Sequence, residues 1–394
     1  MTDLPKVFFD VSIKDKPIGR IVFELFADKA PLATENFLHI CKGDVSKTYN
    51  DGTKTLTFKD NFFHRIIKNF MIQAGDIVYG SGPFDKSDNI GTGGCSIYAT
   101  DDELKEKKDL ACYGYFKDEN LGEFTEPFLL AMATTGEPNT NTSQFFVVTY
   151  PSPHLNNKHT ILGKVLHGKS VIRTVEYSEV DSDGFPLECV RISDCGEWND
   201  SMPIPLFNAS NNPICGDIYE EYPGDDTHFD QEKFDECFKA ANTIKEAGSA
   251  LFKLKDYQNA YYKYKKSLSY VNEFIPEKDV DIELNAKFID LKIKLYLNLC
   301  LLSYNLKEYD QALDYATYAL ETEGIDTKDK AKAYYRTGNT YLVKKAYDDA
   351  LKNFKLCKEN NPDDKVVDSK IEHVQDIIEK NKEKTKKNIA KFFS

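Results

Sequence analysis

The chain has 394 residues, 41% of them hydrophobic and 13% aromatic, which is enough for two or three ordinary domain cores. Its net charge of −13 argues against general nucleic-acid binding, and no apolar run approaches the roughly eighteen residues that span a membrane. The N-terminus lacks the pattern of a secretory signal, and nine cysteines without a CxxC pair are typical of reduced thiols. We therefore predict a cytoplasmic protein with no nucleic-acid or membrane partner.

The first half of the chain, residues 1–199, reads as short β-runs separated by turns. The clearest runs are residues 6–13, 17–26, 62–67, 128–133, 144–149, 160–166 and 190–196. Helical patterns interrupt them near residues 31–41 and 170–177. Many short strands with few helices predict a closed antiparallel β-barrel with capping helices.

Residues 200–235 are acidic and contain four prolines among Asn, Asp and Glu. Such a composition lacks the apolar periodicity of a packed element. We predict an extended linker that ends where a helix begins near Asp230.

Residues 236–380 are helical, with apolar residues recurring at three- and four-residue steps. A Lys-x-Tyr-x-x-Ala motif occurs three times, with its tyrosine at positions 257, 309 and 347. The intervals of 52 and 38 residues exceed the period of about 34 of a tetratricopeptide repeat, and longer loops at 272–283 and 324–328 would explain the excess. This segment resembles a tetratricopeptide solenoid of three repeats followed by a further helix.

Residues 381–394 are strongly basic and read as an extension of that last helix. Two interpretations stay open. The extension is either a solvated helix end or a target for a calmodulin-like or acidic partner.

Five motifs in the first half carry a family resemblance. They are FFHRIIKNFMIQAGD (62–76), GTGG (91–94), FKDEN (116–120), NTSQFFV (141–147) and HLNNKHTILGKV (154–165). In this order and spacing they resemble the cyclophilins, which are peptidyl-prolyl cis–trans isomerases, over residues 6–198. Against the compact members of that family, residues 43–59 and 100–113 are inserted charged loops. The first insertion lies near Cys41, which with Cys195 is either a redox pair or a pair of core cysteines.

The resemblance implies a catalytic set of Arg65, Phe70, Gln73 and His159. Rotation about an X–Pro bond is slow because of amide resonance, so a guanidinium that donates to the prolyl nitrogen would lower the barrier. Arg65 takes that role, and Gln73 would bind the substrate backbone and steady Arg65. No acid, base, metal or cofactor is expected, since no proton moves.

The substrate-binding residues implied by the resemblance are Met71, Ala133, Thr134, Gln144, Phe146, His154 and Leu155. The apolar ones would form a slot for the proline ring together with Phe70 and His159, and the alternative is that they are barrel core. His154 stands where small cyclophilins carry tryptophan, so we expect weakened cyclosporin binding. Thr134 replaces the usual asparagine, so we expect a changed substrate preference.

Five residues of the second half resemble the carboxylate clamp of tetratricopeptide domains that bind heat-shock protein 90. They are Lys245, Ser249, Asn298, Lys332 and Arg336. Ser249 departs from the pattern, because asparagine is usual there and a hydroxyl offers one donor where an amide offers two. The alternative is that these are ordinary exposed helix side chains.

The whole chain resembles the forty-kilodalton class of cyclophilins. This implies a peptidyl-prolyl isomerase that docks as a co-chaperone on the acidic C-terminal tail of heat-shock protein 90 and acts on X–Pro-containing clients. The alternative function is that of an adaptor or holdase with a weakly active barrel.

Overall fold

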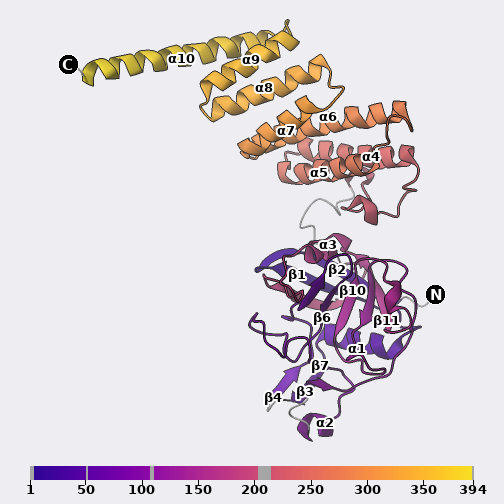
Figure 1. Cartoon of the computed structure of the whole chain (residues 1–394). Coiled ribbons are helices and arrows are strands. Elements are labelled where there is room, and N and C mark those ends of the chain that lie inside the picture. Colours follow the sequence, from indigo (N-terminus) through magenta and orange to yellow (C-terminus); the bar gives the residue numbers. More distant parts are fainter. Residues whose placement is uncertain (1–3, 50–51, 107–110, 203–213, 393–394) are drawn as a thin grey trace. The chain divides into compact units, whose positions relative to one another are not determined.

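The computed structural model describes residues 4–49, 52–106, 111–202 and 214–392 of the chain (Figure 1). The chain forms two compact units, Met1–Phe207 and Asn208–Ser394. Each unit is described separately below.

The first unit is built on an eight-stranded antiparallel sheet with the strand order β12–β1–β2–β11–β9–β10–β6–β5. The strands are β1 Lys6–Ile13, β2 Lys16–Leu25, β5 Arg65–Ile67, β6 Met71–Ala74, β9 Leu129–Met132, β10 Phe145–Val148, β11 Ile161–His167 and β12 Val190–Trp198. Backbone hydrogen bonds join the two edges of the sheet, from Phe63 N to Val190 O at 2.9 Å and from Ile192 N to Asn61 O at 2.8 Å. The predicted closed barrel is therefore confirmed.

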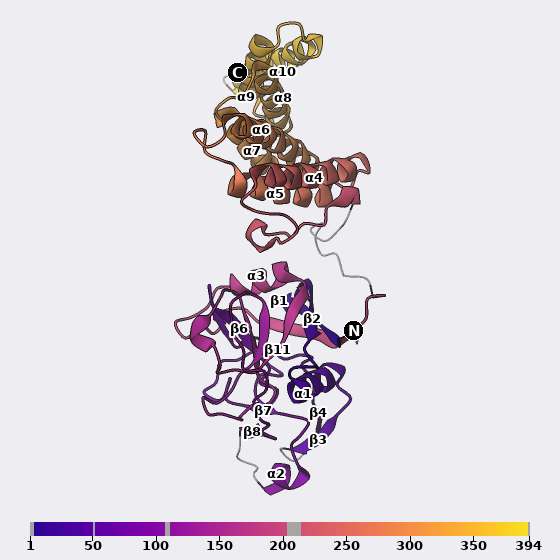
Figure 2. The ribbon, with the colours of Figure 1, turned by 90° about the vertical axis from the view of Figure 1, so that its right-hand side faces the viewer.

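Two helices pack on the barrel where the sequence predicts them, α1 (Pro31–Lys42) and α3 (Lys169–Glu176). The predicted charged loops, however, contain regular structure. The first forms a hairpin of β3 (Ser46–Tyr49) and β4 (Gly52–Thr55), and the second contains α2 (Asp101–Glu106), which lies beside β3 (Figure 2). A further pair of short strands, β7 Gly94–Cys95 and β8 Cys112–Tyr113, runs parallel. Residues 50–51 and 107–110 of these loops lie outside the described residues.

Aromatic side chains fill the barrel. The ring of Phe9 lies 5.3–5.8 Å from the rings of Phe23, Phe37, Phe58 and Phe145, and all five are fully buried. Burial of each such ring stabilises the fold by roughly 2–3 kcal/mol. Since side chains alternate along a strand, the inward Phe145 turns its neighbours on β10 to the other face of the sheet.

Within residues 214–392, helices follow one another in pairs and a final helix ends the series (Figure 1). The pairs are α4 Phe234–Lys253 with α5 Tyr257–Phe274, α6 Ile282–Asn305 with α7 Tyr309–Glu321, and α8 Thr327–Val343 with α9 Tyr347–Asn360; the last helix is α10 Lys365–Phe392. This arrangement confirms the predicted helical repeat solenoid. The basic segment that begins at residue 381 continues α10, and its side chains are exposed up to residue 386; those of 387–394 lie outside the description.

The repeated motif forms the turn inside each helix pair. Its lysine adopts a left-handed conformation, with φ of 63° at Lys255, 67° at Lys307 and 61° at Lys345. In the first pair, the N–H of Asp256 donates to the carbonyl of Leu251 at 3.0 Å, which is the long hydrogen bond of a Schellman motif. The motif therefore ends the first helix, and its tyrosine begins the second.

The uneven spacing of the motif has a different cause from the one predicted. The predicted long loop at 272–283 is wrong, because residues 272–274 belong to α5, residues 282–283 belong to α6, and only 275–281 connect the two helices. The excess is taken up mainly by longer helices, since α5 has 18 residues against 13 in α7 and α6 has 24 against 17 in α8.

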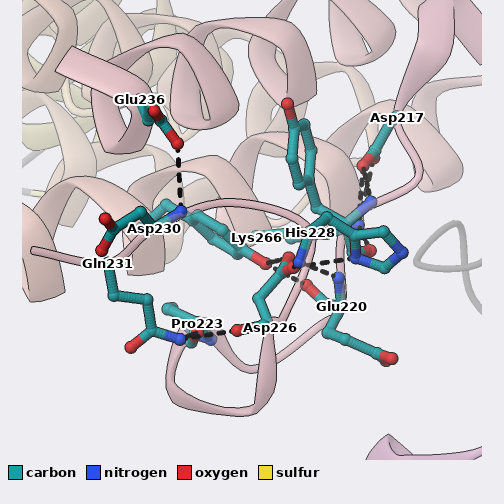
Figure 3. Close-up of polar contacts among 11 residues, drawn as sticks. Asp217, Glu220, Pro223, Asp226, His228, Asp230, Gln231, Glu236 and Lys266 are labelled. Carbon is teal, nitrogen blue, oxygen red and sulfur yellow. Dashed lines mark hydrogen bonds and ion pairs between the residues drawn. The ribbon is translucent and has the colours of Figure 1, made fainter. Parts of the chain in front are cut away.

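The predicted linker also differs from an extended chain. Residues 203–213 lie outside the description, but residues 214–233, which we name the strap, pack against the repeat unit (Figure 3). Asp217 of the strap is buried and contacts Nζ of Lys263 and Nζ of Lys266, the latter at 2.9 Å. Both lysines are buried on α5.

A second buried carboxylate fixes the other end of the strap. Asp226 accepts hydrogen bonds from the hydroxyl of Tyr270 at 2.5 Å, from the N–H of Glu220 at 2.9 Å and from the N–H of His228 at 2.8 Å. Phe229 packs beside Tyr270, at a ring separation of 6.2 Å. Because Tyr270, Lys263 and Lys266 come from α5, the strap belongs to the second unit. The first long helix begins at Phe234 rather than near Asp230. Among the described residues, no helix is long and apolar enough to cross a membrane.

Candidate functional site

The sheet register aligns three of the predicted site residues in one row. Arg65 pairs with Gln73 across β5 and β6, and Gln73 pairs with Phe146 across β6 and β10. Side chains of directly paired residues lie on the same face, with their Cβ atoms about 5 Å apart. The alternate residues, among them Phe145, face the barrel core. The row therefore lies on the outer face of the sheet.

An apolar cluster adjoins this row, separate from the barrel core. Met71 and Phe146 are buried in it, and Phe70, Ala133 and Leu155 pack against it while half-exposed. The structure therefore brings the predicted pocket residues together. Phe124, Leu129 and Ile161 also belong to the cluster. Ile161 lies within the last of the five motifs, but none of the three was predicted as a pocket residue. The ring of Phe124 stacks on that of Phe146 at 6.0 Å, a contact that only the fold creates.

Two histidines border the apolar cluster. The ring of His154, an exposed residue, lies 4.9 Å from that of Phe70, and the ring of His159 meets Phe146 edge-on at 5.1 Å. Nδ1 of His159 lies 3.1 Å from the carbonyl of Met132, which can only accept, so Nδ1 carries the hydrogen. Burial lowers the pKa of His159. His159 is therefore neutral at pH 7, and Nε2 is left as an acceptor.

Arg65 is exposed and makes no hydrogen bond or ion pair with any described residue. Together with His64 and Gln73 it lines a pocket of about 280 Å³, which Gly91 and Phe185 also border. The amide nitrogen of Gln73 donates to Oε1 of Gln144 at 2.9 Å. The predicted contact of Gln73 with Arg65 is not present, but Oε1 of Gln73 accepts no hydrogen bond within the described residues.

His64 lies buried next to Arg65, on the same pocket. Burial lowers its pKa to about 4, an effect that the nearby Asp76 opposes only in part. The ring is therefore uncharged at pH 7 and adds no cation beside the Arg65 guanidinium.

The remaining predicted groove residues lie where β9 ends. The N–H of Ala133 donates to the carbonyl of Gln144 at 2.9 Å, which joins the two strands at this point. Thr134 is half-buried, and its hydroxyl accepts from the N–H of Gly136 at 3.4 Å. Ala133 thus lies beside Gln144, and Thr134 follows it directly in the chain.

The two cysteines considered as a redox pair are both free thiols. Cys41 on α1 is buried, and Sγ of Cys195 on β12 lies 3.6 Å from the hydroxyl of Thr57. Burial raises the pKa of both thiols, and the proximity of Cys195 raises that of Cys41 further. Both therefore stay protonated at pH 7, and the redox pair stays a prediction.

The predicted clamp residues lie on the first helix of each pair. Lys245 and Ser249 are on α4, Asn298 is on α6, and Lys332 and Arg336 are on α8. Since α6 contacts both α4 and α8, the five positions follow one continuous helical layer. Asn298 is half-buried within this layer.

Each clamp cation already has a partner within the chain. Nζ of Lys245 lies 2.6 Å from Oε1 of Glu246, and Nζ of Lys332 lies 2.7 Å from Oδ1 of Asp329. The guanidinium of Arg336 donates to the carbonyl of Leu297, one residue before Asn298. A bound carboxylate would therefore have to compete with these contacts.

Ser249 is also engaged. Its hydroxyl donates to the carbonyl of Lys245 at 3.1 Å, and Tyr264 lies 3.1 Å away with its own hydroxyl. Because a hydroxyl has a single hydrogen, Tyr264 must act as the donor in the second contact. Ser249 therefore offers no free donor in this state.

A pocket of about 720 Å³ adjoins the third-repeat pair, Lys332 and Arg336. It is also lined by Leu301, Tyr304, Tyr335, Asn339 and Val366, from α6, α8 and α10. The three other predicted clamp residues do not line it. Its aromatic walls could not be predicted, because tyrosines recur throughout the repeats and most of them pack between helices.

Comparison with known proteins shows what the chain is similar to. The family model described as cyclophilin type peptidyl-prolyl cis-trans isomerase matches residues 8–197. Peptidyl-prolyl cis-trans isomerase CYP7 of Saccharomyces cerevisiae is 58% identical over 390 residues, which are 99% of each chain.

The chain belongs to the cyclophilin family of peptidyl-prolyl cis–trans isomerases. Two further relatives match this cyclophilin over nearly their full length. Peptidyl-prolyl cis-trans isomerase D of Kluyveromyces lactis is 37% identical over 99% of each chain, and the protein of the same name from Eremothecium gossypii is 35% identical over 100% of each. The family model thus covers the first unit of this cyclophilin, whereas the three relatives match both units.

Proposed function

We propose that this cyclophilin isomerises X–Pro bonds at the row of Arg65, Gln73 and Phe146. The observation that carries the proposal is the exposed Arg65 guanidinium, which has no partner in the described chain and stands at the edge of an apolar slot. Phe70, Met71, Phe146, Leu155 and His159 would hold the proline ring. Arg65 would then donate to the prolyl nitrogen, and the free oxygen of Gln73 would accept from Arg65 or from the substrate backbone.

The transition-state stabilisation that the site must supply is modest. The uncatalysed barrier is about 18–20 kcal/mol, and each 1.4 kcal/mol of preferential transition-state stabilisation accelerates the reaction about tenfold. One charge-assisted hydrogen bond to the prolyl nitrogen supplies roughly 2–4 kcal/mol, and thus a gain of about thirtyfold to a thousandfold. Because His159 and His64 are neutral, no general acid competes with Arg65 for that nitrogen.

The test is the Arg65→Ala variant. Magnetisation exchange between the cis and trans forms of a short X–Pro peptide measures the catalysed rate without a coupled enzyme. We expect Arg65→Ala to lower kcat/KM at least thirtyfold, and Lys68→Ala, the change of an exposed lysine three positions later, to leave it within twofold. An unchanged rate in Arg65→Ala would refute the assignment.

Ala133, Thr134 and Gln144 would line the path of the substrate backbone. We also propose that cyclosporin binds weakly, because His154 is exposed and its ring lies against Phe70, where an indole donor would otherwise reach the drug. Replacement of His154 by tryptophan should tighten cyclosporin binding.

We further propose that the repeats dock on the acidic C-terminal tail of heat-shock protein 90. Lys245, Ser249, Asn298, Lys332 and Arg336 would form the clamp for the terminal carboxylates. Their common layer on α4, α6 and α8 supports this, since it gathers three cations along one helical layer of an otherwise acidic chain. The contacts that these side chains make within the chain predict a weakened clamp.

Titration calorimetry tests the docking. A peptide that ends in Met-Glu-Glu-Val-Asp is titrated into the full chain as the free acid and as the C-terminal amide. We expect micromolar binding of the free acid that is lost on amidation. Equal binding of both forms, or none, would contradict a carboxylate clamp.

The second candidate function is that of an adaptor or holdase whose barrel contributes only binding surface. The specialised repeats and the inserted β3–β4 hairpin favour it. An Arg65→Ala protein that loses isomerase activity but still supports the same client output would show that the adaptor role dominates. A cytoplasmic location fits both candidates, as does the expected lack of nucleic-acid and membrane partners.

A further inference from the structure

Asp76 is a fully buried carboxylate with no assigned role in isomerisation. It follows β6 and accepts four backbone hydrogen bonds. Oδ1 accepts from the N–H groups of Val78 at 3.2 Å and Tyr79 at 2.9 Å, and Oδ2 accepts from those of Gly91 at 2.8 Å and Gly93 at 3.0 Å. The second pair ties the loop 91–93 to the end of β6, beside the candidate active site.

The loop fits Asp76 closely and requires glycine. Gly91 has a φ of 85°, which side chains disfavour, and a Cβ at Gly93 would lie 2.4 Å from Oδ1 of Asp76. The sequence motif GTGG therefore reflects the approach of the backbone to this carboxylate. An uncompensated charge could not be buried here, and the four donors stabilise it.

The other side of the loop holds Gln144. Its amide nitrogen donates to the carbonyl of Gly91 at 2.8 Å and to the carbonyl of Gly93 at 2.7 Å. Both amide hydrogens are thus used, and a flipped amide would place its oxygen against two carbonyls. The orientation of Gln144 is therefore fixed, with Oε1 turned toward Gln73.

This orientation decides what Gln73 can offer. Since Oε1 of Gln144 can only accept, Gln73 must present its amide nitrogen to it, at 2.9 Å. The oxygen of Gln73 is then left for the other side, where its cross-strand partner is Arg65. A single order of donors and acceptors runs from Asp76 through the loop and Gln144 to Gln73.

We propose that Asp76 is a positioning residue for the isomerase: by fixing the loop 91–93 it orients Gln144, and through it the Gln73 oxygen, to which the proposed function assigns the steadying of the Arg65 guanidinium. The proposal rests on the proposed roles of Arg65 and Gln73. Asp76 itself touches neither substrate nor Arg65, so its effect must pass through Gln73.

The test is a double-mutant cycle of Asp76→Asn and Gln73→Ala, measured as kcat/KM by cis–trans exchange. Asparagine keeps the shape of Asp76 but turns one acceptor into a donor that faces backbone N–H groups. We expect Asp76→Asn to lower kcat/KM about tenfold in the native background and less than twofold in the Gln73→Ala background. Thr92→Ala is the control, because Thr92 lies in the same loop and its hydroxyl donates to the Asn89 carbonyl at 2.7 Å, away from Asp76 and Gln144.

An equal loss in both backgrounds would overturn the proposal, since it would mean that Asp76 acts on the fold in general. No loss in a folded Asp76→Asn protein would overturn it as well. The wild-type rate and that of Arg65→Ala, measured in the same series, separate this outcome from failure of the isomerase assignment itself. If the isomerase assignment itself fails, the wild type is inactive or Arg65→Ala is fully active.

If Asp76→Asn does not fold, the wild-type protein still decides. The side-chain amide hydrogens of Gln144 are followed by hydrogen exchange in nuclear magnetic resonance spectra. We expect them to exchange at least a hundredfold more slowly than those of the exposed Asn89. Exchange at the rate of Asn89 would show that the network does not persist, and would overturn the proposal.

Discussion

The candidate isomerase site and the repeat layer differ in how their charged side chains are paired. Arg65 is exposed and unpaired within the described chain. Beside it lie the neutral amides of Gln73 and Gln144, and the buried Asp76 fixes the loop that Gln144 contacts. In the repeats, Lys245, Lys332 and Arg336 each have a partner before any ligand arrives. The difference teaches that the two tasks need different preparation. Catalysis gains from a donor that is left free for the substrate, whereas a docking site can exchange one partner for another.

The largest expected effect concerns a third kind of charge, the buried ion cluster that fixes the strap. Asp217→Ala removes the carboxylate between the buried Lys263 and Lys266, and loss of one partner of a buried ion pair costs about 3–5 kcal/mol. Urea unfolding, followed by the helical signal, should show a free energy of unfolding that is lower by that amount. Glu232→Ala, an exposed strap residue, is the control.

An apolar replacement of the whole cluster sharpens this prediction. Asp217→Leu combined with Lys263→Met and Lys266→Met removes all three charges while it keeps the volume, and should recover most of the lost stability. If the triple variant is as unstable as Asp217→Ala, the strap is held by contacts other than these charges.

The next effect is a pH dependence of the free energy of unfolding, which distinguishes the barrel from the repeats. The pKa of His64 is lowered to about 4 in the folded barrel and returns to about 6.5 on unfolding. The unfolded chain therefore binds more protons between these values, and the barrel loses stability as the pH falls from about 6.5 to about 4. The loss is up to roughly 3 kcal/mol.

Fluorescence of Trp198 measures this effect, because it is the one tryptophan of the sequence and is buried on β12. Urea unfolding at pH 7, 5.5 and 4.5 should show a steeper loss in the wild type than in His64→Gln. The comparison of the two proteins isolates His64, since burial also lowers the pKa of His159 and His167. If the free energies of unfolding of the wild type and of His64→Gln fall in parallel as the pH is lowered, the prediction is contradicted.

A smaller effect is expected in the repeat layer. Lys332→Ala should weaken binding of the free-acid tail peptide about tenfold, which corresponds to about 1.4 kcal/mol for one charged hydrogen bond. The contribution should shrink as salt is raised, because the lysine side chain is 48% exposed. Lys330→Ala on the same helix is the control. Equal affinities of Lys332→Ala and the wild type would remove Lys332 from the clamp.

The smallest expected effect is a gain in affinity for the tail peptide. Ser249→Asn should tighten tail binding by up to about fivefold, because an amide has two hydrogens to donate where the hydroxyl has one that is already used. Ser269→Asn is the matched control, since its hydroxyl makes the same bond to the carbonyl four residues earlier but lies exposed on α5. Weaker binding in Ser249→Asn would show that the contact with Tyr264 matters more.

The sequence was sufficient where a local pattern determines the structure. The short β-run at residues 6–13 predicts β1 to the residue, and the repeated lysine–tyrosine motif marks all three turns. It was insufficient where the partner is distant. Asp217 reads as part of an acidic linker, because its burial depends on lysines 46 and 49 positions later, on α5.

The candidate site likewise has features that the sequence predicts and features that depend on distant partners. Arg65, Gln73 and Phe146 could be predicted from their motifs, and the register then places them in one row. The engagement of Ser249 by Tyr264 and the role of Asp76 could not be predicted, since hydrogen-bond direction depends on atoms that only the fold brings together. Composition also hid the hairpin β3–β4 and α2, because charged residues on their exposed faces resemble those of a loop.

The most direct test of the proposed role of the Arg65 guanidinium is the rate of Arg65→Lys. Lysine keeps the charge but replaces the planar fork by a flexible ammonium. The catalysed cis–trans exchange of an X–Pro peptide is measured for the wild type, Arg65→Lys and Arg65→Ala. We predict that Arg65→Lys loses at least tenfold in kcat while the peptide still binds, because charge without orientation does not suffice. Full activity in Arg65→Lys would contradict the account.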